Sequence, residues 1–114
     1  MLSISTEYEG GSLHIALTGE FDHHAAARAL ELSRCALDRF LPRTCGLDLS
    51  ALSFMDSSGI AFILRMKKIL SSMGSDFYLI CPSGQPGRVI DASGIQRLVR
   101  LQHPEKERET NEVY

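Results

Sequence analysis

The sequence has little excess charge of either sign and no long hydrophobic run. Its 114 residues include 12 basic and 14 acidic side chains, which gives a formal net charge of −2. Such a balance supplies no strong field to attract nucleic acid or an anionic membrane. The apolar stretch 59–64 is far too short to cross a hydrocarbon core of roughly 30 Å. We therefore expect a soluble protein that binds neither nucleic acid nor membrane.

Cysteine is scarce, and its pattern excludes a disulfide framework. Cys35, Cys45 and Cys81 are odd in number and lie in largely apolar segments. No signal-peptide pattern precedes them, whereas secreted proteins held by disulfides show paired cysteines behind such a signal. We expect reduced thiols and a cytoplasmic location.

The sequence also lacks the motifs of common catalytic and cofactor sites. Ser57 is not in a Gly-x-Ser-x-Gly setting, and no Gly-x-x-x-x-Gly-Lys-Ser/Thr loop is present to hold a nucleotide phosphate. Asp22, His23 and His24 could suggest a metal site, but adjacent helical residues point about 100° apart, and the cysteines show no ligand spacing. We expect no enzymatic activity, no metal and no cofactor, so any ATP comes with a partner.

The length and hydrophobic content of the chain suit one compact domain with a short extension. The hydrophobic content of 44% is enough for a single core in a chain of this length. Residues 104–114 are charged and nearly devoid of aliphatic side chains, a composition that cannot form a core. We predict a folded domain over residues 1–103 and a flexible C-terminal tail over residues 104–114.

The N-terminal quarter of the chain has the pattern of an antiparallel hairpin. Two runs typical of strands, 2–8 and 12–18, are separated by a turn that contains Gly10 and Gly11, and paired glycines permit the positive φ of a tight turn. The second run alternates apolar and other side chains, as in a strand with one buried face. His14 falls on the other face, where we expect an ordinary surface histidine.

The rest of the chain alternates helical and strand patterns. We predict helices over 23–41, over 57–73 and from Pro86 to Gly94, with strands over 44–49, 77–81 and 98–101. Asp22 and Asp56 should cap the first two helices, and Pro42 should end the first. The uniformly apolar strand 77–81 should be covered on both faces. The core-facing positions are expected to be Ala26, Leu30, Leu37 and Leu41 in the first helix and Ile63, Met66, Leu70 and Met73 in the second.

These patterns define a fold class. A strand, a helix and a strand in succession imply a right-handed parallel crossover. We therefore predict an α/β protein with a mixed sheet of four to five strands that opens with an antiparallel hairpin, and with helices packed chiefly on one side.

The segment 48–59 is the most informative part of the sequence, because it joins a buried strand to the start of a helix. Ser57 follows the capping Asp56 and so lies in the first helical turn, where free N–H groups and the helix dipole favour an added anion. A phosphate there would add about −1.5 to −2 charges to one point of the surface. Taken alone, Asp-Ser-Ser-Gly is also explained simply as a helix start.

Three motifs give a resemblance to a known family. Three segments of the chain have the order and spacing of motifs seen in STAS domains. They are 17–24, 48–59 and 90–95. Together they make residues 2–101 resemble the bacterial anti-sigma factor antagonists, and most of all those that act in the forespore during sporulation. The resemblance implies the STAS fold.

The resemblance also implies a function and a set of site residues. Members of this family bind an anti-sigma factor that is itself a serine kinase, and thereby release a sigma factor. The kinase phosphorylates the first serine of the motif, here Ser57, and a phosphatase reverses this. The surface implied for the partner comprises Asp22, His23, His24, Asp56, Ser58 and Ile60.

Some positions differ from the family pattern. Phe21 replaces the usual leucine, Cys45-Gly46 stands where β-branched residues are favoured, and Gln85-Pro86-Gly87-Arg88 is an unusual start for a helix. The alternative interpretation is a STAS scaffold or a nucleotide-sensing accessory domain without a phosphorylation switch. A kinase assay on Ser57 separates the two.

Overall fold

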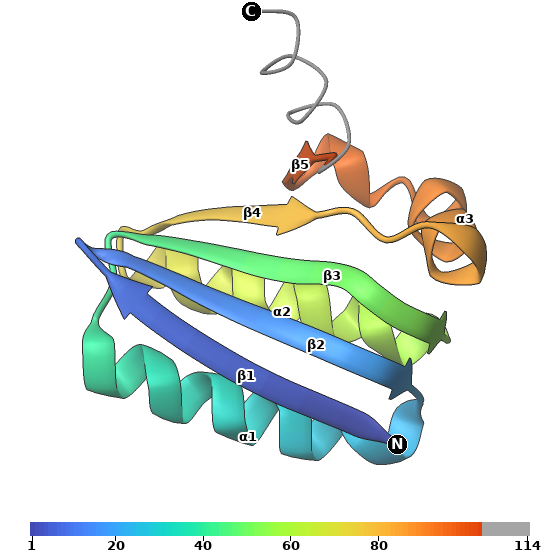
Figure 1. The fold of residues 1–114 in the computed structure, drawn as a ribbon. Coiled ribbons are helices and arrows are strands. Elements are labelled where there is room, and N and C mark those ends of the chain that lie inside the picture. The colour runs from blue at the N-terminus through green and yellow to red at the C-terminus, as the bar shows by residue number, and fades with distance from the viewer. Residues whose placement is uncertain (104–114) are drawn as a thin grey trace, which may run out of the picture.

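The computed structural model describes residues 1–103 and has a five-stranded sheet flanked by helices (Figure 1). Residues 104–114, for which a flexible tail was predicted, lie outside the described residues. The elements in chain order are β1 (Leu2–Glu9), β2 (Ser12–Phe21), α1 (His23–Phe40), β3 (Thr44–Met55), α2 (Ser57–Ser72), β4 (Asp76–Ile80), α3 (Gly84–Ser93), a 3₁₀ turn (Ile95–Arg97) and β5 (Arg100–Gln102).

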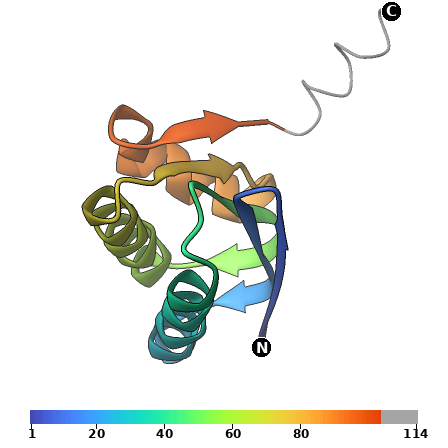
Figure 2. The same cartoon turned by 90° about the vertical axis from the view of Figure 1, so that its left-hand side faces the viewer.

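The sheet is mixed and has the strand order β1-β2-β3-β4-β5. The first two strands form the predicted antiparallel hairpin, with Gly10 and Gly11 at φ 59° and 87° in the turn. The other neighbouring strands are parallel, and helices connect them. Figures 1 and 2 show α1 and α2 side by side against one face of the sheet. The predicted α/β fold class is confirmed.

The core lies between the sheet and α1 and α2. It follows the predicted alternation, because the side chains of β2 and β3 that point toward the helices are fully buried. Burial raises the pKa of the Cys45 thiol to about 12, so this thiol stays neutral. The side chains that contribute most to the core are Leu13, Ile15, Leu17, Cys45, Leu47, Leu49 and Leu79 from the strands and Ile63, Met66 and Leu70 from α2.

The predicted buried face of α1 is partly wrong. Leu37 is buried, but Leu41 is 69% exposed because it is the left-handed C-cap (φ 45°) that leads into Pro42. Ala26 and Leu30 are only half-buried. The residues that face the core are Ala29, Ser33, Ala36 and Leu37. We attribute this rotation to the small side chains of Ala29, Ser33 and Ala36, which let the helix backbone approach the sheet closely.

Several element boundaries also differ from the prediction. The strand predicted over 44–49 continues to Met55, because β2 pairs with it as far as Phe21, with irregularities near Thr18 and Gly19. The third helix begins before Pro86, which is accommodated in the first turn because N–H groups there have no intrahelical acceptor. In β4 only Leu79 is fully buried, so full cover on both faces was wrong.

Within residues 1–103, no helix is both long and apolar enough to span a membrane. The longest helix, α1, has exposed polar side chains along its outer face.

Candidate functional site

Two helix N-termini meet at one edge of the sheet. Because β2 and β3 are parallel neighbours, they end together, with Phe21 paired to Met55. The backbone N–H of Asp56 donates to the Phe21 carbonyl at 3.1 Å, which ties the start of α2 to the end of β2. Asp22 and Asp56 therefore follow adjacent strand ends, and the segments 17–24 and 48–59 are brought together at the ends of β2 and β3 (Figure 1).

The two aspartates cap the helices as predicted. Asp22 Oδ1 accepts the Ala25 backbone N–H at 3.0 Å, and Asp56 Oδ1 accepts the Ser58 backbone N–H at 2.9 Å. Each bond satisfies one of the free N–H groups of a first helical turn. The positive ends of two helix dipoles thus lie at the same edge of the sheet, a setting that favours negative charge.

The carboxylate of Asp56 is stabilised in its charged form. The Ser58 hydroxyl donates to Asp56 Oδ1, and this bond is the main reason that the pKa of Asp56 lies below its ordinary value. Partial burial acts in the opposite direction, while the Ser58 backbone N–H, the charge of His23 and the His23 backbone N–H lower the pKa further. Asp56 is therefore an anion at neutral pH.

The two serines of the motif have different surroundings. Ser57 is exposed, and its hydroxyl makes no hydrogen bond within residues 1–103. Ser58 is half-buried, and its hydroxyl already donates a hydrogen bond to Asp56. An incoming enzyme can reach the Ser57 oxygen without breaking a bond, whereas reaction at Ser58 would disrupt the cap of α2.

The histidines lie at the start of α1. His23 and His24 are both exposed, and their ring centroids are 3.9 Å apart. The expectation that adjacent helical side chains diverge was wrong for these rings, because rotation about the side-chain bonds brings them together. In the described residues, no three His, Cys, Asp or Glu side chains are grouped so as to hold a metal ion.

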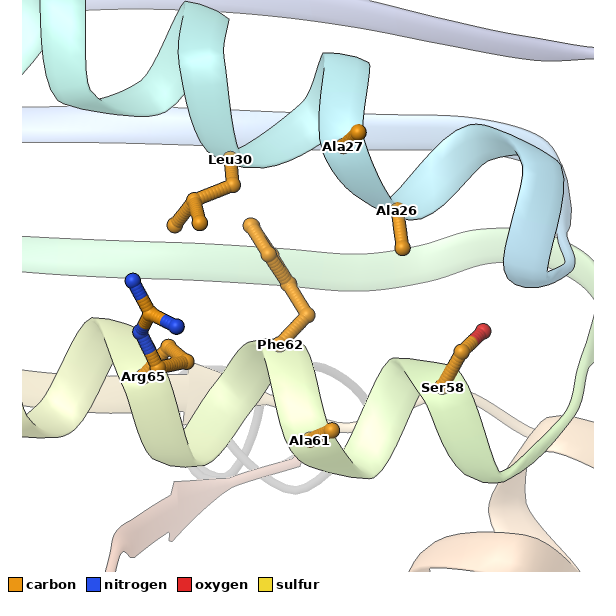
Figure 3. A pocket seen from close by; sticks show the side chains of 7 residues that line it. All are labelled: Ala26, Ala27, Leu30, Ser58, Ala61, Phe62 and Arg65. Carbon is orange, nitrogen blue, oxygen red and sulfur yellow. The ribbon is translucent and has the colours of Figure 1, made fainter.

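A shallow groove of about 230 Å³ separates the first halves of α1 and α2 (Figure 3). The Ser58 and Arg65 side chains both extend toward α1 from positions two turns apart. Phe62, 4% exposed, packs on Phe21 with ring centroids 5.2 Å apart and closes the floor. The remaining walls are alanines and a leucine: Ala26, Ala27, Leu30 and Ala61.

A second groove lies between α2 and α3 and was missed by the sequence analysis. Ser57 and Ile60, both predicted site residues, form part of its wall, and Leu64 and Val89 extend it. Nothing in the sequence indicated that α3 lies beside α2, because this depends on contacts between segments that are distant in the chain. One such contact is made by Gln85, whose side-chain amide donates to the Met55 carbonyl and accepts the Met55 N–H, both at 2.9 Å.

Known proteins are similar to this chain in both fold and sequence. A family model for the STAS domain matches residues 3–108. An anti-sigma F factor antagonist of Paenibacillus polymyxa is 32% identical over 105 residues, which cover 88% of this chain and 86% of the relative. The solved structure of the anti-sigma factor antagonist SpoIIAA in its unphosphorylated form matches with a TM-score of 0.75 and 25% identity over 98% of both chains.

A second solved form of this relative is also similar. The Bacillus cell fate determinant SpoIIAA in the phosphorylated form matches with a TM-score of 0.67 and 26% identity, over 95% of this chain and 98% of that chain. The resemblance indicated by the motifs is confirmed. Since the family model covers most of the chain and the Paenibacillus relative aligns over nearly its whole length, the chain belongs to the STAS-domain family of anti-sigma factor antagonists.

Proposed function

We propose that this protein binds an anti-sigma factor with serine kinase activity, that binding releases a sigma factor, and that phosphorylation of Ser57 ends the interaction. The contact surface is the edge of the sheet where Asp22, His23 and His24 meet the start of α2. The observation that carries the proposal is the pair of serines: the Ser57 hydroxyl is exposed and free within residues 1–103, while Ser58 is bonded to Asp56.

The proposed switch follows from charge. A phosphate on Ser57 would lie beside the Asp56 carboxylate, which is charged at neutral pH. At the centre of an interface this group must lose its water and meet like charge, a penalty that can reach several kcal/mol. Two or three kcal/mol already weaken binding about 30-fold to 150-fold, since each 1.4 kcal/mol is about tenfold.

The relatives support a reversible modification. SpoIIAA has been solved in unphosphorylated and phosphorylated forms, and both resemble this chain. Reversal requires a protein phosphatase as a second partner. The kinase would supply the ATP, so this domain needs no cofactor of its own, and the switch would operate in the cytoplasm.

The proposal is tested by incubating the protein with candidate anti-sigma kinases and ATP and locating phosphate by mass spectrometry. Phosphate is expected on Ser57, and Ser57→Ala should bind the same kinase but resist inactivation. Ser57→Asp should bind at least 30-fold more weakly in titration calorimetry. Ser71→Asp, an exposed position near the other end of α2, is the matched control and should bind like wild type.

Two outcomes would contradict the proposal. Phosphate on Ser58 alone would assign the wrong acceptor. Equal affinity of wild type and Ser57→Asp for the kinase would favour the alternative of a STAS scaffold or a nucleotide-sensing accessory domain without a phosphorylation switch.

A further inference from the structure

The groove between α2 and α3 opens beside Ser57 and is lined mostly by apolar side chains. Its volume is about 520 Å³, and no charged side chain lines it. Leu64, one of the lining residues, is 39% exposed. The walls include Ser57, Ile60 and Leu64 from α2 and Val89, Ala92 and Ser93 from α3. A groove with this lining suits apolar side chains of a partner.

A double hydrogen bond joins the α3 wall of the groove to the segment 55–58, which contains Ser57 and which we call the switch segment. The pairing of β3 with β4 ends at Asp48, so the β3 edge beyond it has no neighbouring strand on that side. At Met55 the amide of Gln85 takes the place of a strand, since it bonds to both the N–H and the carbonyl. Met55 lies directly before Asp56 and two residues before Ser57. The position of α3 is therefore coupled to the start of α2.

We propose that this groove receives an apolar segment of the anti-sigma factor, which extends the contact from Ser57 along α2 to Leu64 and across to α3. The inference rests on the proposed function and specifies its partner surface. Ser57 and Ile60 belong both to the predicted contact surface and to the groove wall, so the two surfaces are continuous. The α1–α2 groove is smaller and contains Arg65, so it fits a purely apolar segment less well.

The occupied groove also gives phosphorylation a direct effect. A phosphate on Ser57 would place a dianion at the end of an apolar groove. An apolar segment seated there would have to exclude the water that solvates the phosphate, and burying an incompletely solvated charge is costly. Phosphorylation would thus oppose docking through desolvation as well as through repulsion by Asp56.

The test compares two leucines of equal exposure. Leu64→Asp places a charge in the groove. Leu32→Asp places one on the side of α1 next to β1, outside this groove, where the leucine is 38% exposed compared with 39% for Leu64. Affinity is measured by titration calorimetry with the anti-sigma kinase that phosphorylates the wild type. Leu64→Asp should bind at least tenfold more weakly, and Leu32→Asp within twofold of wild type. Ala92→Asp, on the exposed side of α3, should lose affinity like Leu64→Asp.

The outcomes separate this inference from the proposed function. If wild type binds and Ser57→Asp does not, while Leu64→Asp and Ala92→Asp bind like wild type, the groove is not the docking surface and the switch still stands. If wild type binds none of the kinases, the proposed function fails and the inference fails with it. If wild type alone sediments as a dimer that Leu64→Asp converts to a monomer, a second copy fills the groove and the inference is overturned.

Discussion

At the scale of single residues, Asp56 bonds to the second serine of the motif and not to the first. Its carboxylate accepts the Ser58 hydroxyl and backbone N–H and leaves Ser57 free within the described residues. The same local chemistry explains why the caps were predictable, since an aspartate before a helix bonds only to the following turn. The contact of the His23 and His24 rings was not predictable, because rotamers depend on the finished surroundings.

The first prediction concerns Ser58→Ala, which removes the hydroxyl donor to Asp56. Since that bond is the main cause of the lowered pKa, the pKa of Asp56 should rise toward its ordinary value of 3.8. A lowered pKa in the folded state stabilises the fold at pH values above the unfolded pKa, and this stabilisation is lost as the pH falls through the folded pKa. Ser58→Ala should therefore be less stable than wild type at neutral pH, with a smaller difference at low pH.

The measurement is an NMR titration of the Asp56 carboxyl carbon together with urea unfolding at neutral and acid pH. Ser57→Ala is the matched control, because Ser57 donates no bond to Asp56 within residues 1–103, and it should leave the Asp56 titration unchanged. An unchanged Asp56 pKa in Ser58→Ala would mean that the dipole and His23 hold the carboxylate without the hydroxyl.

At the scale of elements, the sequence predicted which segments are helices and strands better than where they end. The helical period of α2 placed Ile63, Met66 and Leu70 in the core, because a repeat along one helix is a local property. The extension of β3 to Met55 was missed, since it depends on pairing with β2 and on the amide of Gln85. Contacts between distant segments leave no periodic signal in either one.

The second prediction concerns Gln85→Ala, which removes both hydrogen bonds to Met55. The Met55 N–H and carbonyl would lose partners in a partly buried setting, so the free energy of unfolding should fall by about 1–3 kcal/mol. Urea unfolding measures the loss. Gln96→Ala is the matched control, because Gln96 is exposed, and it should change stability by less than about 0.5 kcal/mol.

Gln85→Ala also tests the coupling of α3 to the switch segment. If Gln85 holds α3 against α2, amide exchange in α3 should accelerate in the variant more than exchange in α1. A uniform acceleration throughout the domain would mean that Gln85 contributes to stability without positioning α3.

At the scale of the whole molecule, the candidate site is a consequence of topology. Parallel neighbouring strands end at the same edge of a sheet, so the residues that follow β2 and β3 meet although they are distant in the chain. A parallel crossover was predicted from the sequence, but it was the family resemblance that implied one partner surface containing Asp22 and Ser57. The α2–α3 groove was not implied, because the position of α3 depends on side-chain contacts that a strand order does not specify.

The last prediction concerns the stability of the phosphorylated domain. A phosphate on Ser57 gains from the free N–H groups and dipole at the start of α2 and loses from the neighbouring Asp56 carboxylate, so these effects oppose each other. We expect the free energy of unfolding to change by less than about 1 kcal/mol, which for a domain of this size shifts the melting temperature by less than about 8 °C. Calorimetry of the phosphorylated protein, with a phosphatase-treated sample as the matched control, measures the shift. Amide chemical shifts should change mainly near Asp22, Ser57 and the first turn of α3. A phosphorylated domain that unfolds at room temperature would mean that inactivation acts through loss of the fold and not through charge at the interface.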